Sequence, residues 1–228
     1  MAVREPALRW HHGDKFIAGT ERWKVTIAEP EALRIGLYIR DVAGLAPLTE
    51  PAIPPLDPPC DVWPVWSRRP IDVPMSGAVR LLGGRDVDLV VASGQWARWW
   101  MHALDVGTGA IDDFRPPAFL PLSGVPDLRA LVQRHFHNAN LWSDGVNDDP
   151  RTKHALSAPG SGLNAMIWDL PKTLGRRPAQ FSMRITVIGV QTKHAWMLAP
   201  DHVLMTRHLV ADIDNVLDWL RPRILAFG

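Results

Sequence analysis

The stretch FSMRITVIGV, residues 181–190, decides the fold class because it is rich in β-branched residues and predicts a β-strand. Residues 194–200, HAWMLAP, follow after the short turn QTK and predict a second strand. HVLMT, residues 202–206, predicts a third strand. Strands that follow one another, without a regular alternation of strand and helix along the chain, are typical of an α+β fold rather than of a doubly wound parallel sheet.

Helices are expected on both sides of this run of strands. Over residues 208–220 apolar side chains recur along one helical face, and Pro222 is expected to end that helix. Three further helices are expected earlier in the chain, over residues 94–104, 125–140 and 163–175. The stretch 143–161 is polar and rich in turn residues, so it predicts a loop.

The first part of the chain predicts a hairpin. Residues 23–28, WKVTIA, read as one strand. In residues 33–42, LRIGLYIRDV, apolar residues alternate with arginine, glycine and tyrosine, a period of two that predicts a strand with one buried face. A fully apolar strand is also expected over 87–92, and a short strand over 79–82.

A proline-rich segment, residues 44–76, interrupts these elements and contains nine of the 21 prolines. Proline removes a backbone donor and fixes φ, so neither a regular helix nor a central strand is expected here. The segment predicts an extended arm that lies on the domain or on a neighbour, although a plain surface linker is the alternative. Trp63 and Trp66 are expected to hold the arm in place, because exposed indoles leave apolar area in water.

These segments together predict an α+β fold with a largely antiparallel or mixed sheet, about four helices and a proline-rich extended arm. We divide the chain into an N-terminal hairpin region over 1–43, the arm over 44–76 and a main α+β domain over 77–228. A length of 228 residues is compatible with a single domain overall.

Composition and charge narrow the class of function. The 25 basic and 24 acidic residues are interspersed, and no basic stripe that would suit nucleic acid is present. No apolar run has the length of a signal peptide or a membrane span, so we expect a cytoplasmic protein without a membrane partner. Cys60 is a single thiol in a proline-rich stretch and reads as an ordinary residue. Nucleotide-binding motifs are absent, so no cofactor is expected.

Eleven tryptophans are many for a chain of this size. Trp96, Trp99 and Trp100 are spaced at i, i+3 and i+4, so on a helix they share one face. Such a face usually packs inward, and an exposed aromatic platform is the alternative. Tryptophan and arginine are also the residues of protein contact surfaces, so these three and the two tryptophans of the arm are the candidate interface residues.

Two histidines in RHFHNANLWSDG, residues 134–145, form the candidate metal site, with His135, His137 and Asp144 as ligands. On a helix, side chains two residues apart point about 200° apart around the axis, so one ion does not meet both imidazoles. We therefore expect His135 to be partly buried near a helix C-terminus, with its cationic form mildly favoured, and His137 to be exposed. Asp201 and His202 are adjacent as well, but a pair of this kind has low specificity.

The sequence thus favours a non-enzymatic interaction or structural protein, a homo-oligomer or a component of a larger assembly, whose partner is another protein chain. Two alternatives stay open. One is a metal-dependent hydrolase that uses histidine and aspartate from loops, and the other is a small-molecule binder with a tryptophan-lined pocket, although a small-molecule partner is less expected.

Overall fold

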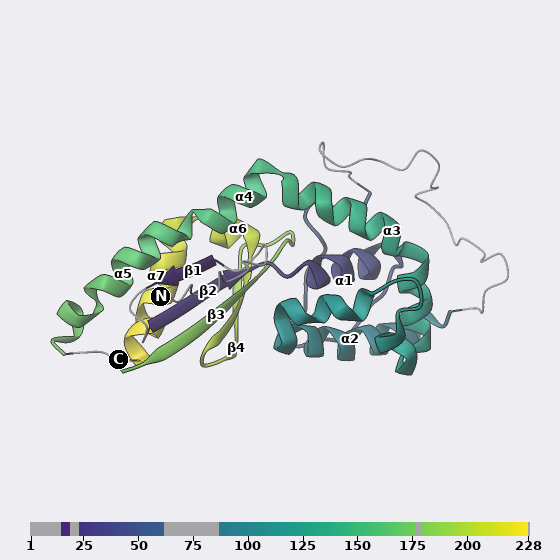
Figure 1. The fold of residues 1–228 in the computed structure, drawn as a ribbon, viewed down its shortest axis with the longest axis horizontal. Coiled ribbons are helices and arrows are strands. Elements are labelled where there is room, and N and C mark those ends of the chain that lie inside the picture. The colour runs from purple at the N-terminus through teal and green to yellow at the C-terminus, as the bar shows by residue number, and fades with distance from the viewer. Residues whose placement is uncertain (1–14, 19–22, 62–86, 177–178, 228) are drawn as a thin grey trace, which may run out of the picture.

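The computed structural model describes residues 15–18, 23–61, 87–176 and 179–227 (Figure 1). In chain order the elements are β1 (Lys15–Ala18), β2 (Trp23–Ala28), α1 (Glu31–Val42), α2 (Leu89–Val106), the 3-10 helices η1 (Gly107–Phe114) and η2 (Leu120–Gly124), α3 (Pro126–Asp148), α4 (Pro150–Ser157), α5 (Pro159–Leu174), β3 (Phe181–Ile188), β4 (Ala195–Ala199), β5 (His202–Thr206), α6 (Arg207–Val210) and α7 (Ile213–Phe227). The predicted short strand over 79–82 lies outside the described residues.

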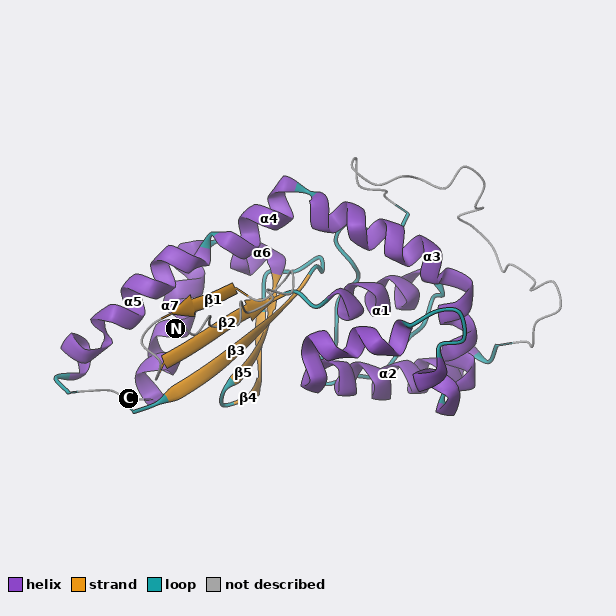
Figure 2. Cartoon of the chain, in the orientation of Figure 1, coloured by secondary structure: helices purple, strands orange, loops and turns teal. Residues whose placement is uncertain are grey.

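The strands form one mixed sheet in the order β1-β2-β3-β5-β4 (Figure 2). Its three central strands, β2, β3 and β5, are parallel, while β1 and β4 run antiparallel to their neighbours at the two edges. The strands predicted at 23–28, 181–190, 194–200 and 202–206 are confirmed, as is the α+β class with a mixed sheet. β1 pairs with β2, so the first hairpin exists but uses a different partner strand from the expected one.

The two faces of the sheet meet different helices. Met183, Ile185 and Val187 of β3 face a cluster of buried side chains from α5, α6 and α7, which we call the sheet core. The helices α1, α2 and α3 lie to the other side and enclose a second cluster, which we call the helical core (Figure 1). Ile188 and Leu204 of the sheet also belong to the helical core, so the sheet contributes side chains to both cores.

The strand predicted over 33–42 is wrong, because these residues form α1. Every residue from Ala32 to Arg40 is buried, so this helix has no polar face from which its period could be recognised. A strand would direct Arg34 to solvent, whereas in α1 its guanidinium donates to Ser143 Oγ at 3.0 Å and to the carbonyl of Glu29. Gly36 allows α2 to approach, since a Cβ there would lie 2.3 Å from the Trp99 ring.

The strand predicted over 87–92 is also wrong, because α2 begins at Leu89. The Asp88 carboxylate accepts hydrogen bonds from the amides of Val90 and Val91 and so caps the helix, while Val90 is 83% exposed. The loop predicted over 143–161 is the end of α3, all of α4 and the start of α5. The helix α7 continues through Pro222, which the sequence had suggested as its end. The described chain therefore has more helices than the expected four or so.

The described part of the proline-rich segment shows no separate arm. Residues 44–61 lie against the domain, with Leu45 and Leu56 buried in the helical core. Leu56 forms an isolated antiparallel bridge with Val190, just beyond β3. The remainder of the segment, with Trp63 and Trp66, lies outside the described residues.

A buried ion pair ties the end of β2 to the last part of the chain. The Arg207 guanidinium donates to both carboxylate oxygens of Glu29 and to the carbonyl of Asp57. The Glu29 side chain is fully buried and that of Arg207 is 11% exposed. Gly189 leaves room for the guanidinium, because a Cβ there would lie 2.4 Å from Arg207 Nη2.

Candidate functional site

A cleft of about 1040 Å³ lies between the sheet and the helical core. The sheet supplies one wall through all five residues of β4 together with Arg184, Asp201 and His202. The last turns of α2 supply a second wall through Met101, Leu104 and Asp105, and residues 49–52 of the proline-rich segment supply the third. The lining thus combines apolar side chains with several charged ones, which is the make-up of a binding site.

The polar side of the sheet positions the charged groups of the cleft. In the parallel register of β3 and β5, Arg184 lies directly beside His202, and Arg184 Nη2 donates to His202 Nδ1 at 3.0 Å. Because arginine has no acceptor, Nδ1 must be the unprotonated nitrogen of a neutral imidazole. His202 Nε2 therefore carries the proton and donates it to Thr186 Oγ1 at 2.9 Å. The same guanidinium donates through Nη1 to the carbonyl of Asp105 at 2.7 Å and so connects the sheet to α2.

Burial and, to a lesser extent, the neighbouring charge of Arg184 together lower the pKa of His202 to about 4, against the smaller opposing effect of Asp201 and Asp105. The imidazole is only 6% exposed and both of its nitrogens are engaged. A general base needs a free nitrogen within reach of a substrate proton and a pKa near the working pH. In this arrangement His202 orients Arg184 and Thr186 and has no free nitrogen for proton transfer.

The edge strand β4 lines the cleft and has no partner strand on its outer side among the described residues. The amide of Thr206 donates to the carbonyl of His194 at 3.0 Å, which makes these two residues a hydrogen-bonded pair. In antiparallel strands hydrogen-bonded and non-hydrogen-bonded pairs alternate, so Trp196 also bonds to β5, whereas the amides and carbonyls of Ala195 and Met197 point away from it. A β-bulge between Met197 and Ala199 ends the regular pairing.

Three carboxylates give the cleft an acidic character. Glu50, Asp105 and Asp201 are exposed and line the cleft, and none of them forms an ion pair within 4.0 Å with another described residue. The one guanidinium of the cleft, that of Arg184, is engaged with a carbonyl and an imidazole. The side chains of the cleft therefore carry an excess of negative charge.

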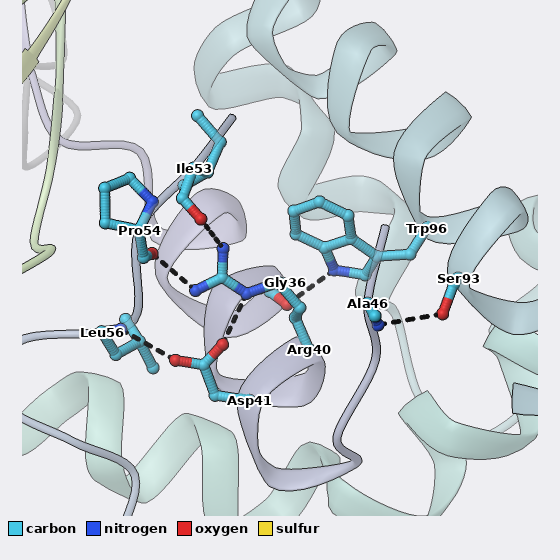
Figure 3. A network of polar contacts seen from close by, with 9 residues as sticks. All are labelled: Gly36, Arg40, Asp41, Ala46, Ile53, Pro54, Leu56, Ser93 and Trp96. Atoms are coloured by element: carbon cyan, nitrogen blue, oxygen red, sulfur yellow. Dashed lines mark hydrogen bonds and ion pairs between the residues drawn. The ribbon is translucent and has the colours of Figure 1, made fainter. Parts of the chain in front are cut away.

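A polar network fixes the proline-rich wall to the helical core (Figure 3). Arg40 of α1 donates to the carbonyls of Ile53 and Pro54 at 2.9 and 2.7 Å, and the Asp41 carboxylate accepts from the amide of Leu56. At the other end of the wall the amide of Ala46 donates to Ser93 Oγ at 3.1 Å. Anchored on both sides in this way, residues 49–52 hold a defined position opposite the sheet.

The candidate tryptophans of α2 lie in the helical core. Trp96 and Trp100 are fully buried and stacked, with ring centroids 5.0 Å apart, and Trp99 is 6% exposed. Trp96 Nε1 donates to the Gly36 carbonyl and Trp99 Nε1 to Asp113 Oδ2. The prediction that this face packs inward is confirmed, and the three indoles offer no exposed face to a partner. Trp63 and Trp66, the other two candidates, lie outside the described residues.

The candidate metal ligands are not brought together. His135 and His137 lie on α3, the first half-buried and the second exposed, and Asp144 is exposed beside Asn140. Among the described residues, no group of three histidine, cysteine or acidic side chains is placed to hold a metal ion. The expectation of a cationic His135 near a helix end is wrong, because α3 runs on to Asp148. Burial, aided by the charge of Arg134, lowers the pKa of His135 to about 4.

The cleft residues were missed because they come from three separate parts of the chain. One signal was present: Ser182, Arg184 and Thr186 alternate with the apolar residues of β3, which indicates a polar face. The adjacent Asp201 and His202 were noticed only as a weak metal motif. The acidic side chain of Glu50, and the placing of residues 49–52 opposite β4, carry no local signal.

The chain matches no protein-family model, no curated protein and no solved structure in the comparisons made. None of the described helices has the length and apolar character that crossing a bilayer requires.

Proposed function

We propose that this chain is a non-enzymatic interaction protein whose cleft receives a segment of a protein partner, either a second copy of the chain or another member of an assembly. One observation carries the proposal: the cleft runs along the whole of β4, an edge strand whose outward amides and carbonyls lack described partners. Unpaired strand edges attract other polypeptides, and proteins that do not use an edge usually cover or blunt it.

The chemistry of the lining favours binding over catalysis. Both imidazole nitrogens of His202 are engaged, one with Arg184 and the other with Thr186. The Thr49 hydroxyl donates to the carbonyl of Pro51. Cys60 does not line the cleft; it is half-buried, and burial raises the pKa of its thiol, which disfavours the reactive thiolate. Thr49, Arg184 and His202 are thus hydrogen-bonded within the protein, while the exposed carboxylates and the apolar surface between them are left for a ligand, as in sites that hold a peptide.

A selection from a random peptide library on the immobilised full chain tests this proposal. The matched variants are Ala52→Trp, which places an indole inside the cleft, and Ala165→Trp, which places one at the smaller groove between α5 and α7. Both alanines are exposed, so neither substitution should disturb folding.

We expect selected peptides to bind the wild type and Ala165→Trp alike and to lose at least about tenfold in affinity for Ala52→Trp. Peptides that bind all three proteins equally, or a selection that yields no binder, would count against the proposal. Light scattering of the same preparations gives the mass in solution. A mass above that of one chain which falls to the monomer value in Ala52→Trp would identify the partner as a second copy.

A further inference from the structure

We infer that the segment received by the cleft is an extended strand with basic side chains, which adds to the free edge of β4. This inference rests on the proposed function and goes beyond it, because it names the conformation and the charge of the occupant.

The conformation follows from the register of β4. Ala195 and Met197 direct their amides and carbonyls away from β5, so they can form the paired hydrogen bonds of an antiparallel or parallel neighbour. A helix satisfies its own backbone groups and would leave these four groups of β4 without partners. The bulge before Ala199 interrupts the edge, so the added strand would pair mainly with the first half of β4.

The apolar lining also suits an extended chain. Side chains of an added strand alternate between the two faces of the sheet. Trp196 and Leu198 lie on the side of β4 that faces the helical core, and Met197 lies on the opposite side and is 44% exposed. Met101 of α2 is 48% exposed at the facing wall. Flexible thioether side chains adapt to ligand side chains of different shape.

The charge of the occupant follows from the carboxylates of Glu50, Asp105 and Asp201, which form no ion pair with another described residue. Lysine or arginine side chains of a bound strand would gain ion pairs with them, whereas acidic side chains or phosphates would be repelled. The β4 of a second copy, with the sequence AWMLA, contains no basic residue, and Lys193 just before it is already paired with Asp212. The charge pattern therefore favours a basic segment from elsewhere.

Fluorescence anisotropy with short labelled peptides tests both parts of the inference. The first probe alternates lysine with valine, and the second has glutamate in place of each lysine. Two further probes keep the lysine–valine sequence but carry N-methyl groups on one or the other set of alternate amides. Only one set of amides in an added strand faces its neighbour, so the two methylated probes should differ.

The expected result is that the lysine probe binds at least about tenfold more tightly than the glutamate probe. One methylated probe should lose about tenfold or more in affinity, while the other stays close to the parent. The variant Asp105→Lys should weaken the lysine probe, and the matched variant Asp218→Lys, on α7 beyond the other face of the sheet, should not.

Three results would overturn the inference: equal binding of the lysine and glutamate probes, equal binding of the parent and both methylated probes, or no binding of any probe. The peptide selection separates these failures from failure of the proposed function. If it yields acidic or helical peptides that Ala52→Trp abolishes, the cleft still binds a partner and only the basic strand is wrong.

Discussion

The helical core and the sheet core are built from different side chains and hold their shape in different ways. The helical core is aromatic, with Trp96, Trp100, Trp142 and Tyr38 fully buried, and arginines reach into it from α1. The sheet core is made mainly of aliphatic residues and methionine, with Phe181 at the start of β3, and the polar residues of its strands lie on the opposite face. The sheet core therefore depends mainly on apolar area, whereas the helical core depends also on the hydrogen bonds that hold the Trp96 and Trp99 rings in one arrangement.

The largest loss of stability is expected at the ion pair of Glu29 and Arg207, where the two regions are joined. Glu29→Ala leaves the buried Arg207 without its carboxylate, and it should lower the free energy of unfolding by about 3–5 kcal/mol in chemical denaturation. The double variant Glu29→Leu with Arg207→Met removes both charges and should recover most of that loss. If the Glu29→Ala variant unfolds at the same denaturant concentration as the wild type, the ion pair does not hold the two regions together.

Smaller losses of stability are expected from one substitution within each of the two cores. Trp96→Phe removes ring volume and the hydrogen bond to the Gly36 carbonyl, 2.8 Å long, and should cost about 2–4 kcal/mol. Met183→Leu in the sheet core preserves volume and breaks no hydrogen bond, so it should cost less than about 1.5 kcal/mol. Equal losses in the two variants would contradict the distinction between the cores.

Acid is expected to destabilise the folded chain through His202, the histidine on the polar face of the sheet. The folded pKa of His202, about 4, lies below its ordinary value of about 6.5, so the unfolded chain takes up a proton first as the pH falls. Stability should be complete above pH 6.5 and should be lost as the pH falls towards 4, by up to about 1.4 kcal/mol per pH unit for this one proton.

His202→Gln should make the pH dependence of unfolding shallower by that one proton. His135 in the helical core has a similarly lowered pKa, so His135→Gln should also reduce the slope. Denaturant titrations across this pH range measure both changes. An unchanged slope in His202→Gln would mean that its imidazole is protonated in the folded chain.

The smallest effect is expected at an exposed ion pair outside both cores. Lys153 and Asp148 lie 3.0 Å apart, and each side chain is 60% exposed. Lys153→Ala should change the free energy of unfolding by less than about 0.5 kcal/mol, because water and salt screen such pairs. A loss comparable to that of Glu29→Ala would mean that burial does not set the strength of ion pairs in this protein.

The difference between the sheet core and the helical core also explains which elements could be predicted from the sequence. In β3 the buried and polar positions alternate, so the strand and its polar face are visible in its residues. In α1 the buried Arg34 bonds to Ser143, far away along the chain, and the buried Arg40 bonds to the proline-rich segment that follows, although their charge suggested exposure. The divergence of His135 and His137 could be predicted because it depends only on helical geometry.

The cleft could not be predicted in the same way, since its walls come from residues 49–52, α2 and the last strands. Asp105 is a residue of α2 with no special neighbours in sequence, and its relation to Arg184 is created by the fold. Tryptophan content suggested an interface at the residues that in fact fill the helical core. The edge strand β4 itself was predicted, but its position at the border of the sheet was not.

The parallel pairing of β2 with β3 has a consequence for synthesis on the ribosome. β2 ends at Ala28, and its neighbour begins only at Phe181, so the early strand emerges long before the strand that flanks it. The helices α1 to α3 can assemble during this interval, because most of the side chains that they bury come from one another. The hairpin of β1 and β2 cannot join the sheet until β3 has been synthesised. Until then the edge of β2 that later pairs with β3 is a surface that a chaperone could protect.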